Sequence, residues 1–257
     1  MKYVDYDNAE GLNCSGAKIL LQSPLKYKTW LECEDDEQTP ALRLGRLIHL
    51  SILQPDLYDA QIVVAPECDR RTKDGKEIWN NFLLTLRKGQ ESVSRAESEL
   101  IANMSVSAKD AIDKIVSYCG LDGVKQQTEV ALFKTYNGCR IKGRLDMLIG
   151  DVIIDFKSTN DASDYGRDVA KYLYHLQDAW YRELAGAKRF FFVPIEKDKP
   201  NDYQICELDA DAIAEGKRLM DKAVDVYKEC NLYKCFPGYS KDIKTLSLPR
   251  FAKSFDV

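Results

Sequence analysis

The chain has few of the side chains on which most zinc and disulfide sites depend. Its 257 residues include only two histidines, and its eight cysteines form no C-x-x-C pair or other regular framework. A histidine-rich zinc site is therefore nearly excluded. The cysteines are expected to be reduced thiols, most of them buried.

Long apolar segments, repeats, low-complexity tracts and linkers rich in Pro, Gly or Ser are also missing. The longest apolar runs, such as residues 190–195, are far too short to span a membrane, and residues 1–6 lack the apolar stretch of a signal peptide. We therefore expect a cytoplasmic protein with no membrane contact. Because 45% of the residues are hydrophobic and no linker divides the chain, a single domain over residues 1–257 is expected.

The sequence has no excess of positive charge either. Its net charge is −4 and its pI about 5.4, which argue against a general polyanion binder. A nucleic-acid ligand would need positive surface that is local, or confined to one face of an assembly. The pattern G-x-x-x-x-G-K-[ST] is missing too, so ATP-driven unwinding is not encoded in this sequence.

What the sequence does contain is a segment that predicts three short strands joined by two tight turns. Asn137-Gly138 is a strong two-residue hairpin signal, because both central positions of that turn need positive φ. Gly150-Asp151 is a second two-residue candidate. If both turns have two residues, the register of all three strands follows by counting outward from them.

This register places Glu129, Asp146 and Asp155 in one row, with directly opposed Cβ atoms roughly 5 Å apart. Lys157 lies on the same face, because strand side chains alternate. Like charges in opposition destabilise a sheet. One interpretation is a solvent-exposed polar face with a different register. The other is a divalent-cation site, because Mg²⁺ and Mn²⁺ prefer oxygen ligands.

The remaining periodicity predicts a mixed sheet flanked by helices, of α/β or α+β type. Helices are expected over residues 15–23, 40–54, 77–88, 94–118, 164–186 and 210–230, and further strands over 189–195 and 202–208. Residues 69–76 predict a basic loop, which is either simply solvated or in contact with phosphate.

Three polar residues on predicted helices have two interpretations each. His49 lies on a largely buried helix, where it is either structural or a nitrogen ligand beside the acidic row. Gln177 and Tyr181 are four residues apart and share one helix face. They form either an ordinary surface contact or part of a site.

Taken in order, these residues resemble the active-site series of the RecB-type PD-(D/E)XK nucleases. The series consists of His49 in a G-x-x-x-H helix, Glu129, G-R-L-D ending at Asp146, D-F-K over residues 155–157 and Q-D-A-W-Y over residues 177–181. The wider chain is similar to the RecE-type exonucleases, and the similarity covers nearly all of it. The segments concerned are L-R-L-G-R-L-I-H-L-S-I-L-Q-P, D-R-R-T-K-D-G-K, Y-H-L-Q-D-A-W-Y and the tail K-T-L-S-L-P-R-F-A-K.

The resemblance implies a PD-(D/E)XK core with added N-terminal helices. Residues 1–120 would be mainly helical, 121–210 would hold the catalytic sheet and the Q-x-x-x-Y helix, and 211–257 the last helix and a tail. Some RecB-type relatives carry an iron–sulfur cluster. The late cysteines here, at 206, 230 and 235, cannot supply its spacing, and no cluster is predicted.

The resemblance also implies metal-assisted hydrolysis of a phosphodiester with Mg²⁺, which Mn²⁺ would replace. The implied metal ligands are Asp146, Asp155, the Phe156 carbonyl, His49 and Glu129. Lys157 would orient or deprotonate the attacking water. Gln177 and Tyr181 would position the scissile strand or the lysine.

The implied activity is 5′→3′ digestion of one strand of linear duplex DNA, which releases 5′-mononucleotides and leaves a 3′ overhang for a RecT-type annealing protein. A homo-oligomeric ring is implied, tetrameric rather than trimeric, in a bacterial cell and of phage or prophage origin. Candidate phosphate contacts, each also interpretable as an ordinary surface residue, are Lys18, Arg43, Arg46 and Arg144. Alternatives are a flap- or end-specific endonuclease or repair nuclease and a non-catalytic DNA-end-binding module.

Overall fold

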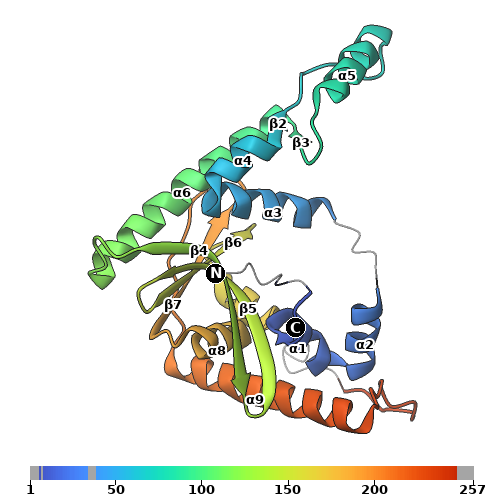
Figure 1. Cartoon of the computed structure of the whole chain (residues 1–257), viewed down its shortest axis with the longest axis vertical. Coiled ribbons are helices and arrows are strands. Elements are labelled where there is room, and N and C mark those ends of the chain that lie inside the picture. The colour runs from blue at the N-terminus through green and yellow to red at the C-terminus, as the bar shows by residue number, and fades with distance from the viewer. Residues whose placement is uncertain (1–5, 7, 34–38, 248–257) are drawn as a thin grey trace, which may run out of the picture.

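A five-stranded mixed sheet forms the centre of the chain (Figure 1). The computed structural model describes residues 6, 8–33 and 39–247, so the end of the tail motif, from residue 248 on, lies outside them. The strands of the sheet are β1 (Leu12–Asn13), β4 (Gln126–Tyr136), β5 (Cys139–Ile149), β6 (Val152–Thr159) and β7 (Arg189–Glu196). One edge of β5 pairs with β4, and the other pairs first with β1 and then with β6, which in turn pairs in parallel with β7.

The two predicted turns and their register are confirmed. Asn137 and Gly138 both have positive φ, at 47° and 74°, as the tight hairpin requires. Strand β4 pairs with β5 on both sides of Glu129, through Thr128 with Met147 and Val130 with Leu145. Glu129 therefore lies opposite position 146, although its own backbone is left-handed, with φ of 52°.

The second hairpin sets Asp146 against Asp155 in the same way. Ile149 pairs with Val152 across the Gly150-Asp151 turn, and the antiparallel ladder ends at Met147 and Ile154. The two aspartates lie one residue beyond this last pair, where β5 and β6 begin to separate. The opening between the two strands leaves room for side chains to converge.

Nine helices are present in the described part of the chain. They are α1 (Cys14–Gln22), α2 (Pro24–Glu32), α3 (Pro40–Leu53), α4 (Pro55–Gln61), α5 (Lys73–Thr85), α6 (Arg95–Cys119), α7 (Tyr165–Lys171), α8 (Tyr174–Ala185) and α9 (Ala210–Tyr233). Several begin at side-chain caps: Thr39 caps α3, Ser94 forms a capping box with Glu97, and Asp209 caps α9.

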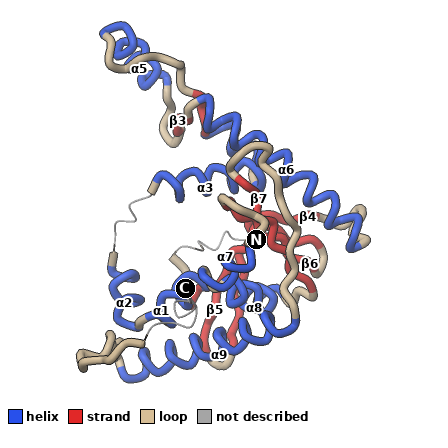
Figure 2. The backbone as a smooth tube through the Cα atoms, turned by 180° about the vertical axis from the view of Figure 1, so that it is seen from behind, coloured by secondary structure: helices blue, strands red, loops and turns tan. Residues whose placement is uncertain are grey.

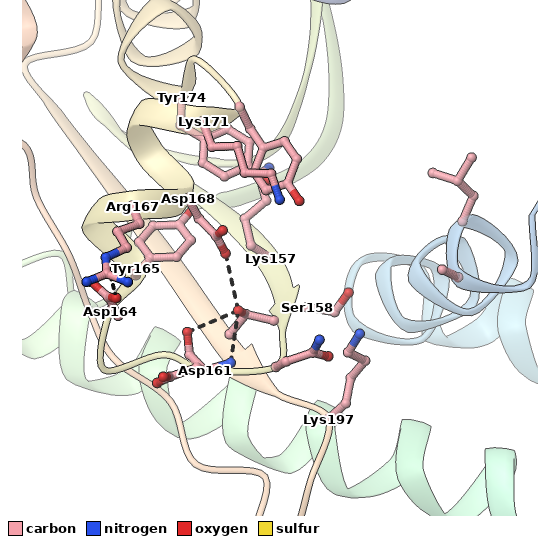
Figure 3. A pocket seen from close by; sticks show the side chains of 15 residues that line it. Lys157, Ser158, Asp161, Asp164, Tyr165, Arg167, Asp168, Lys171, Tyr174 and Lys197 are labelled. Atoms are coloured by element: carbon pink, nitrogen blue, oxygen red, sulfur yellow. Dashed lines mark hydrogen bonds and ion pairs between the residues drawn. The ribbon is translucent and has the colours of Figure 1, made fainter. Parts of the chain in front are cut away.

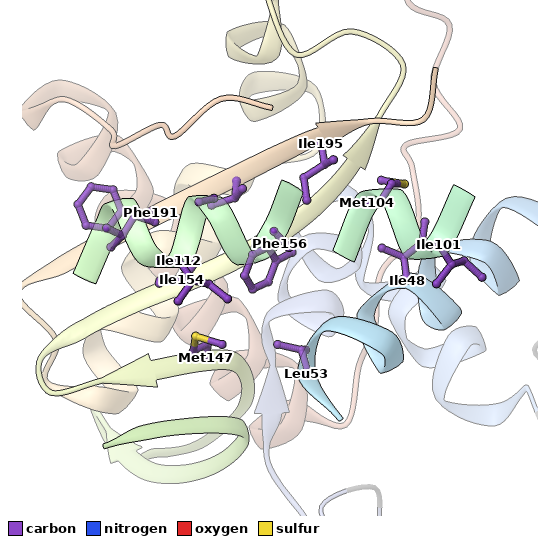
Figure 4. Packing of buried hydrophobic residues seen from close by; sticks show 14 of the residues in the cluster. Ile48, Leu53, Ile101, Met104, Ile112, Met147, Ile154, Phe156, Phe191 and Ile195 are labelled. Carbon is purple, nitrogen blue, oxygen red and sulfur yellow. The ribbon is translucent and has the colours of Figure 1, made fainter. Parts of the chain in front are cut away.

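Helices α3 and α6 cover one face of the sheet, and α8, α9 and α1 cover the other. On the first face Ile154 and Phe156 of β6 belong to one buried cluster with Met104 of α6 and Ile48 of α3 (Figure 4). On the other face Trp180 is fully buried, and its indole donates to the carbonyl of Lys142 at 3.0 Å. Because β6 alternates, Asp155 points away from the α3–α6 face, toward α8.

Three predicted elements are wrong. The expected helix over 164–186 is two helices, α7 and α8, separated at Leu173, whose φ is 52°. Residues 202–208 run antiparallel beside β7 but make only isolated bridges, at Tyr203 and Cys206, because Pro194 between the two bridges has no N–H to donate to a continuous ladder. The last four residues of the expected basic loop 69–76 belong to α5, because Thr72 caps that helix by accepting from the Gly75 backbone.

Helix α5 forms the end of an arm that extends from the body of the molecule (Figures 1 and 2). The sequence did not predict the two short strands at its base, β2 (Ile62–Val64) and β3 (Glu91–Val93), which pair in parallel. Among the residues that the structure describes, no helix is both long and apolar enough to cross a bilayer.

Candidate active site

The carboxylate of Asp155 lies at the centre of the candidate site. It is 1% exposed, although it is charged in its ordinary state. Its Oδ2 contacts the ammonium of Lys157, two residues along β6, and its Oδ1 accepts a hydrogen bond from Nε2 of Gln177 at 2.5 Å. Both carboxylate oxygens therefore have a partner, one in Lys157 of the same strand and one in Gln177 of α8.

Asp146 stands opposite, at the point where β5 leaves β6. Its Oδ2 accepts a hydrogen bond from the backbone N–H of Phe156 at 2.9 Å. Nδ1 of His49, which reaches in from α3, lies 3.4 Å from the same oxygen. Two elements, β6 and α3, thus meet at Asp146, and the Phe156 backbone lies between the two aspartates while its ring packs into the core (Figure 4).

The two aspartates have pKa values displaced in opposite directions. Burial raises the pKa of Asp155 to about 6, against the attraction of Lys157. Burial also acts to raise the pKa of Asp146, but His49, Lys157 and the Phe156 N–H together hold it below its usual range. Such a pair of unequal acids in one site is typical of a catalytic centre, since it provides one readily ionised group and one reluctant group.

The carboxylates favour the protonated forms of the two basic side chains in the site. Burial acts to lower the pKa of His49, but the Asp146 carboxylate outweighs it and raises that pKa. The pKa of Lys157 is likewise raised by Asp155 and Asp146 in spite of its burial. The centre therefore sets two carboxyl groups against a lysine and a histidine whose protonated forms they favour.

Glu129 lies in the same cleft but is engaged by Arg144. The guanidinium Nε of Arg144 is 3.0 Å from Oε2 of Glu129. Both residues, together with His49 and Asp146, line a cleft of about 800 Å³. The three acids thus occupy opposed positions on neighbouring strands, as the sequence predicted. Glu129 is set apart by its left-handed backbone and its own ion pair.

Tyr181, one helical turn beyond Gln177, lies against the sheet. A Cβ at Gly143 would approach its ring to 3.0 Å, so the glycine permits this close packing. Its ring is also near that of Phe190, with centroids 6.3 Å apart. Burial raises the pKa of the phenol well above its ordinary value, so Tyr181 is neutral and supports the strand that carries Asp146.

The four predicted phosphate contacts have different surroundings. Lys18 lies over the ring of Tyr174 at 4.8 Å, on the same ring that Lys157 contacts at 5.2 Å. Arg46 lines the cleft beside His49 and pairs with Glu91. Arg43 is turned toward the base of the arm, where it donates to Glu97 at 2.8 Å and to the Ser92 carbonyl at 2.7 Å.

The donor set of the cleft suits a hard divalent cation. Carboxylate oxygens of Asp146, Asp155 and Glu129 are available in one region, and the buried Asp155 with its raised pKa would gain most from a bound cation. Across residues 6, 8–33 and 39–247, no three Asp, Glu, His or Cys donors already converge on one point. Lys157 and Arg144 hold two of these carboxylates, and a cation would have to replace part of those contacts.

Sequence reasoning missed a second hollow beside Lys157. Its volume is about 520 Å³, and residues of the segment 157–174 form most of it (Figure 3). The signal was present as a run of tyrosines and cations in Y-G-R-D-V-A-K-Y-L-Y, residues 165–174. A single long helix would have spread these side chains around its circumference, whereas the observed break gathers them.

Comparison with known proteins agrees with this architecture. The model of a PDDEXK-like domain of unknown function (DUF3799) matches residues 13–249. A candidate exonuclease from Eubacterium rectale has a similar crystal structure, with a TM-score of 0.61 at 16% identity over 100% of this chain and 97% of that one. No curated protein matches the sequence.

Weaker structural matches include two further proteins. The phage-related exonuclease from Haemophilus somnus matches with a TM-score of 0.37 at 13% identity, over 88% of this chain and 97% of that one. The alkaline exonuclease from Laribacter hongkongensis matches with a TM-score of 0.31 at 17% identity, over 70% of this chain and 96% of that one.

Proposed function

The chain belongs to the PDDEXK-like domain family DUF3799, and from that premise we propose that it is a metal-dependent nuclease. One observation carries the proposal. Asp146 and Asp155 lie on adjoining strands with Lys157 beside them, at the open end of a hairpin and next to a cleft. An Asp pair and a Lys in this arrangement suit the hydrolysis of a phosphodiester.

The chemistry would depend on a divalent cation, Mg²⁺ with Mn²⁺ as a substitute. Such an ion lowers the pKa of a bound water and stabilises negative charge on phosphorus. Asp146 and Asp155 would hold it, with the Phe156 carbonyl, His49 and Glu129 as the further donors at the edge of the cleft.

The protein's own groups would orient the water and the phosphate. Lys157, freed from Asp155, would direct its ammonium toward the attacking water and the non-bridging phosphate oxygens, where developing negative charge is stabilised. Gln177 keeps Oδ1 of Asp155 in place by its hydrogen bond. Tyr181 holds β5 and thereby the position of Asp146.

The reaction that we propose is 5′→3′ exonucleolytic digestion of linear duplex DNA. We further propose that the protein acts in a bacterial cytoplasm and has a phage or prophage origin. The products would be 5′-mononucleotides and a 3′ overhang for a RecT-type annealing protein. We propose a homo-oligomeric ring, with a tetramer favoured over a trimer. Such a ring would reconcile the net charge of −4 with DNA binding. Basic residues would then need to line only the channel.

The alternative is an endonuclease or repair nuclease with the same centre. The acidic centre would perform the same hydrolysis in either enzyme, since the choice between ends and internal sites depends on what surrounds the cleft. A covalently closed circle separates the two, because an end-dependent enzyme leaves it intact.

The test uses linear duplex DNA labelled at either the 5′ or the 3′ end, with Mg²⁺ and a closed circular control. We expect early release of the 5′-labelled mononucleotide and an untouched circle, and cleavage of the circle would establish the endonuclease instead. Asp155→Ala should abolish hydrolysis, whereas Asp151→Ala, in the exposed turn of the same hairpin, should retain it. Absence of hydrolysis with both Mg²⁺ and Mn²⁺ would leave a non-catalytic DNA-end-binding module.

A further inference from the structure

The second hollow lies directly beside the catalytic lysine. Lys157 lines it, and it shares Ser158 and the first turn of α3 with the 800 Å³ cleft. The two hollows therefore adjoin across the carboxyl end of β6. A strand whose phosphate lies at Asp155 would extend into the hollow on one side.

One wall of this hollow is aromatic. Tyr165 and Tyr174 stack with centroids 5.8 Å apart and planes 22° from parallel, and Tyr172 lies 5.6 Å from Tyr174. The ring of Tyr174 already contacts Lys157 and Lys18. Tyr172, by contrast, is 45% exposed, so it is the member of the group most accessible to a ligand.

The residue after Tyr172 has an unfavourable backbone conformation. Leu173, between the two helices, has the left-handed φ of 52°, which a residue with a Cβ rarely adopts. The break turns α8 away from α7 and leaves Tyr172 at the end of α7 instead of inside one continuous helix. Unfavourable backbone of this kind tends to persist where a functional arrangement requires it.

Both signs of charge line the hollow, which includes Asp161, Asp164 and Asp168 as well as its cations. Lys171 lies over the Tyr172 ring at 4.8 Å, and Lys197 stands on the opposite wall (Figure 3). Within the part of the chain that the structure describes, neither ammonium has a carboxylate oxygen within 4.0 Å. The Asp164 carboxylate is engaged by Arg167 at 2.8 Å.

Hydrogen bonds fix the floor of the hollow before any ligand arrives. Thr159 Oγ1 donates to the Asp161 carbonyl or to Asp168, at 3.1 and 3.3 Å, and accepts from the Asp161 N–H at 3.2 Å. The Ala162 N–H donates to Glu196 at 2.9 Å. The loop after β6 is thus tied to both α7 and β7, which makes the hollow a formed site with little ordering still to be done.

We propose that this hollow binds one nucleotide of the cleaved strand, with its base stacked on Tyr172 and its phosphate between Lys171 and Lys197. The inference rests on the proposed nuclease function, because it assigns the nucleotide next to the scissile phosphate. Stacking on a tyrosine accepts every base, since each has a π-face. The site would therefore hold the strand without selecting its sequence.

The first test measures binding of a mononucleotide, which needs no hydrolysis. Deoxyadenosine 5′-monophosphate is titrated with the full chain in Mg²⁺ while the adenine H2 and H8 resonances are followed. Stacking on Tyr172 should shift both upfield. The shift should persist in Tyr172→Phe and vanish in Tyr172→Leu, with a loss of affinity of about tenfold.

The controls separate stacking from packing and from phosphate binding. Tyr172→Leu keeps apolar bulk, and its thermal unfolding should match that of the unsubstituted chain. Tyr233→Ala removes a ring that is 70% exposed on α9 and should leave binding unchanged. Deoxyribose 5-phosphate, which has no base, should bind equally to the chain and to Tyr172→Leu, and more weakly to the Lys171→Gln, Lys197→Gln double variant.

Failure of this inference is distinguishable from failure of the proposed function. If Tyr172→Leu binds the mononucleotide as tightly as the unsubstituted chain, the stacking site is wrong even where DNA is hydrolysed. If binding depends on Tyr172 but no DNA is cut, the nucleotide site stands and the nuclease proposal falls. Equal weakening by Tyr233→Ala would also overturn the assignment.

Discussion

The side-chain amide of Gln177 donates a hydrogen bond to Oδ1 of Asp155 across 2.5 Å, joining α8 to β6. Both side chains are buried, so the bond is made away from competing water. It fixes the orientation of the carboxylate that we assign to the cation. The relationship gives Gln177 a direct part in the acidic centre.

Replacing this glutamine should therefore weaken cation binding without removing a ligand. Gln177→Ala is expected to lower Mn²⁺ affinity, and hydrolysis at limiting Mn²⁺, by about 10–100-fold, the usual effect of deleting a hydrogen bond to a ligand. Calorimetric titration with Mn²⁺ measures the first quantity. Glu183→Ala, on the same helix in an ion pair with Lys134, should match the unsubstituted chain. Equal Mn²⁺ affinity in Gln177→Ala would contradict the positioning role.

Removing the ammonium of Lys157 should abolish turnover rather than binding. Lys157→Met takes away the charge that faces Asp155 and, in the proposed mechanism, the transition-state phosphate. A loss of about 100-fold or more in single-turnover rate at saturating Mn²⁺ is expected, because interactions with developing charge act on the chemical step. Lys157→Arg keeps the charge but not the compact geometry, and should recover only part of the rate. A rate above one tenth of normal in Lys157→Met would exclude the role.

The acidic centre was predictable from sequence because local signals determine it. The turn at Asn137-Gly138 needs positive φ at two adjacent positions, and few dipeptides supply that. Once both turns are placed, counting gives the opposition of Asp146 to Glu129 on one side and to Asp155 on the other. The structure confirms this register. The left-handed backbone of Glu129 was not predicted by it.

The break between α7 and α8 could not be predicted, because no local residue encodes it. The segment 167–185 contains neither Gly nor Pro, and its propensities favour one continuous helix. Packing decides the outcome: Tyr165 and Tyr174 both lie against Phe192 of β7, at 6.0 and 5.8 Å between ring centroids. One straight helix would carry the two tyrosines along its length and could not bring both rings onto that phenylalanine.

Short elements held by distant partners were missed for the same reason. Strand β1 has two residues and exists through its pairing with Ile141 and Lys142, far away in sequence. Strands β2 and β3 pair with each other although the residues of the arm separate them in sequence. A periodicity of two or three residues is too brief to distinguish a strand from a loop.

Core packing under α6 should account for a large part of the stability. Met104 is fully buried between α6 and the sheet, whereas Val106 on the same helix is 71% exposed. Met104→Ala is expected to lower the free energy of unfolding by about 2–5 kcal/mol, through lost burial and the cavity left behind. Val106→Ala should change it by less than about 0.5 kcal/mol. Urea denaturation of the two variants checks the contrast, and equal effects would contradict the packing described for this helix.

The start of α6 should confer a pH-dependent part of the stability through Glu97. Its carboxylate accepts hydrogen bonds from the Ser94 backbone and hydroxyl, at 2.8 and 2.9 Å, and from Arg43 at 2.8 Å. Burial acts to raise the pKa of Glu97, but these donors together hold it below the ordinary value of 4.5. A carboxylate with a lowered pKa stabilises the fold above its unfolded pKa, and that contribution is lost as the pH falls through the folded pKa.

Glu97→Gln should therefore reduce the free energy of unfolding at pH 7 by about 0.5–1 kcal/mol, a value discounted because the ion pair is partly solvated. The difference from the unsubstituted chain should narrow as the pH falls below about 4.5, because Glu97 is protonated first in the unfolded chain and only at a lower pH in the fold. Urea denaturation between pH 7 and pH 4 measures both the difference in the free energy of unfolding at pH 7 and its change with pH. Glu99→Gln is the matched control, since that side chain is 62% exposed and should show little difference at any pH. A Glu97→Gln deficit that stays constant down to pH 4 would mean that the cap acts through geometry alone and that its charge contributes nothing.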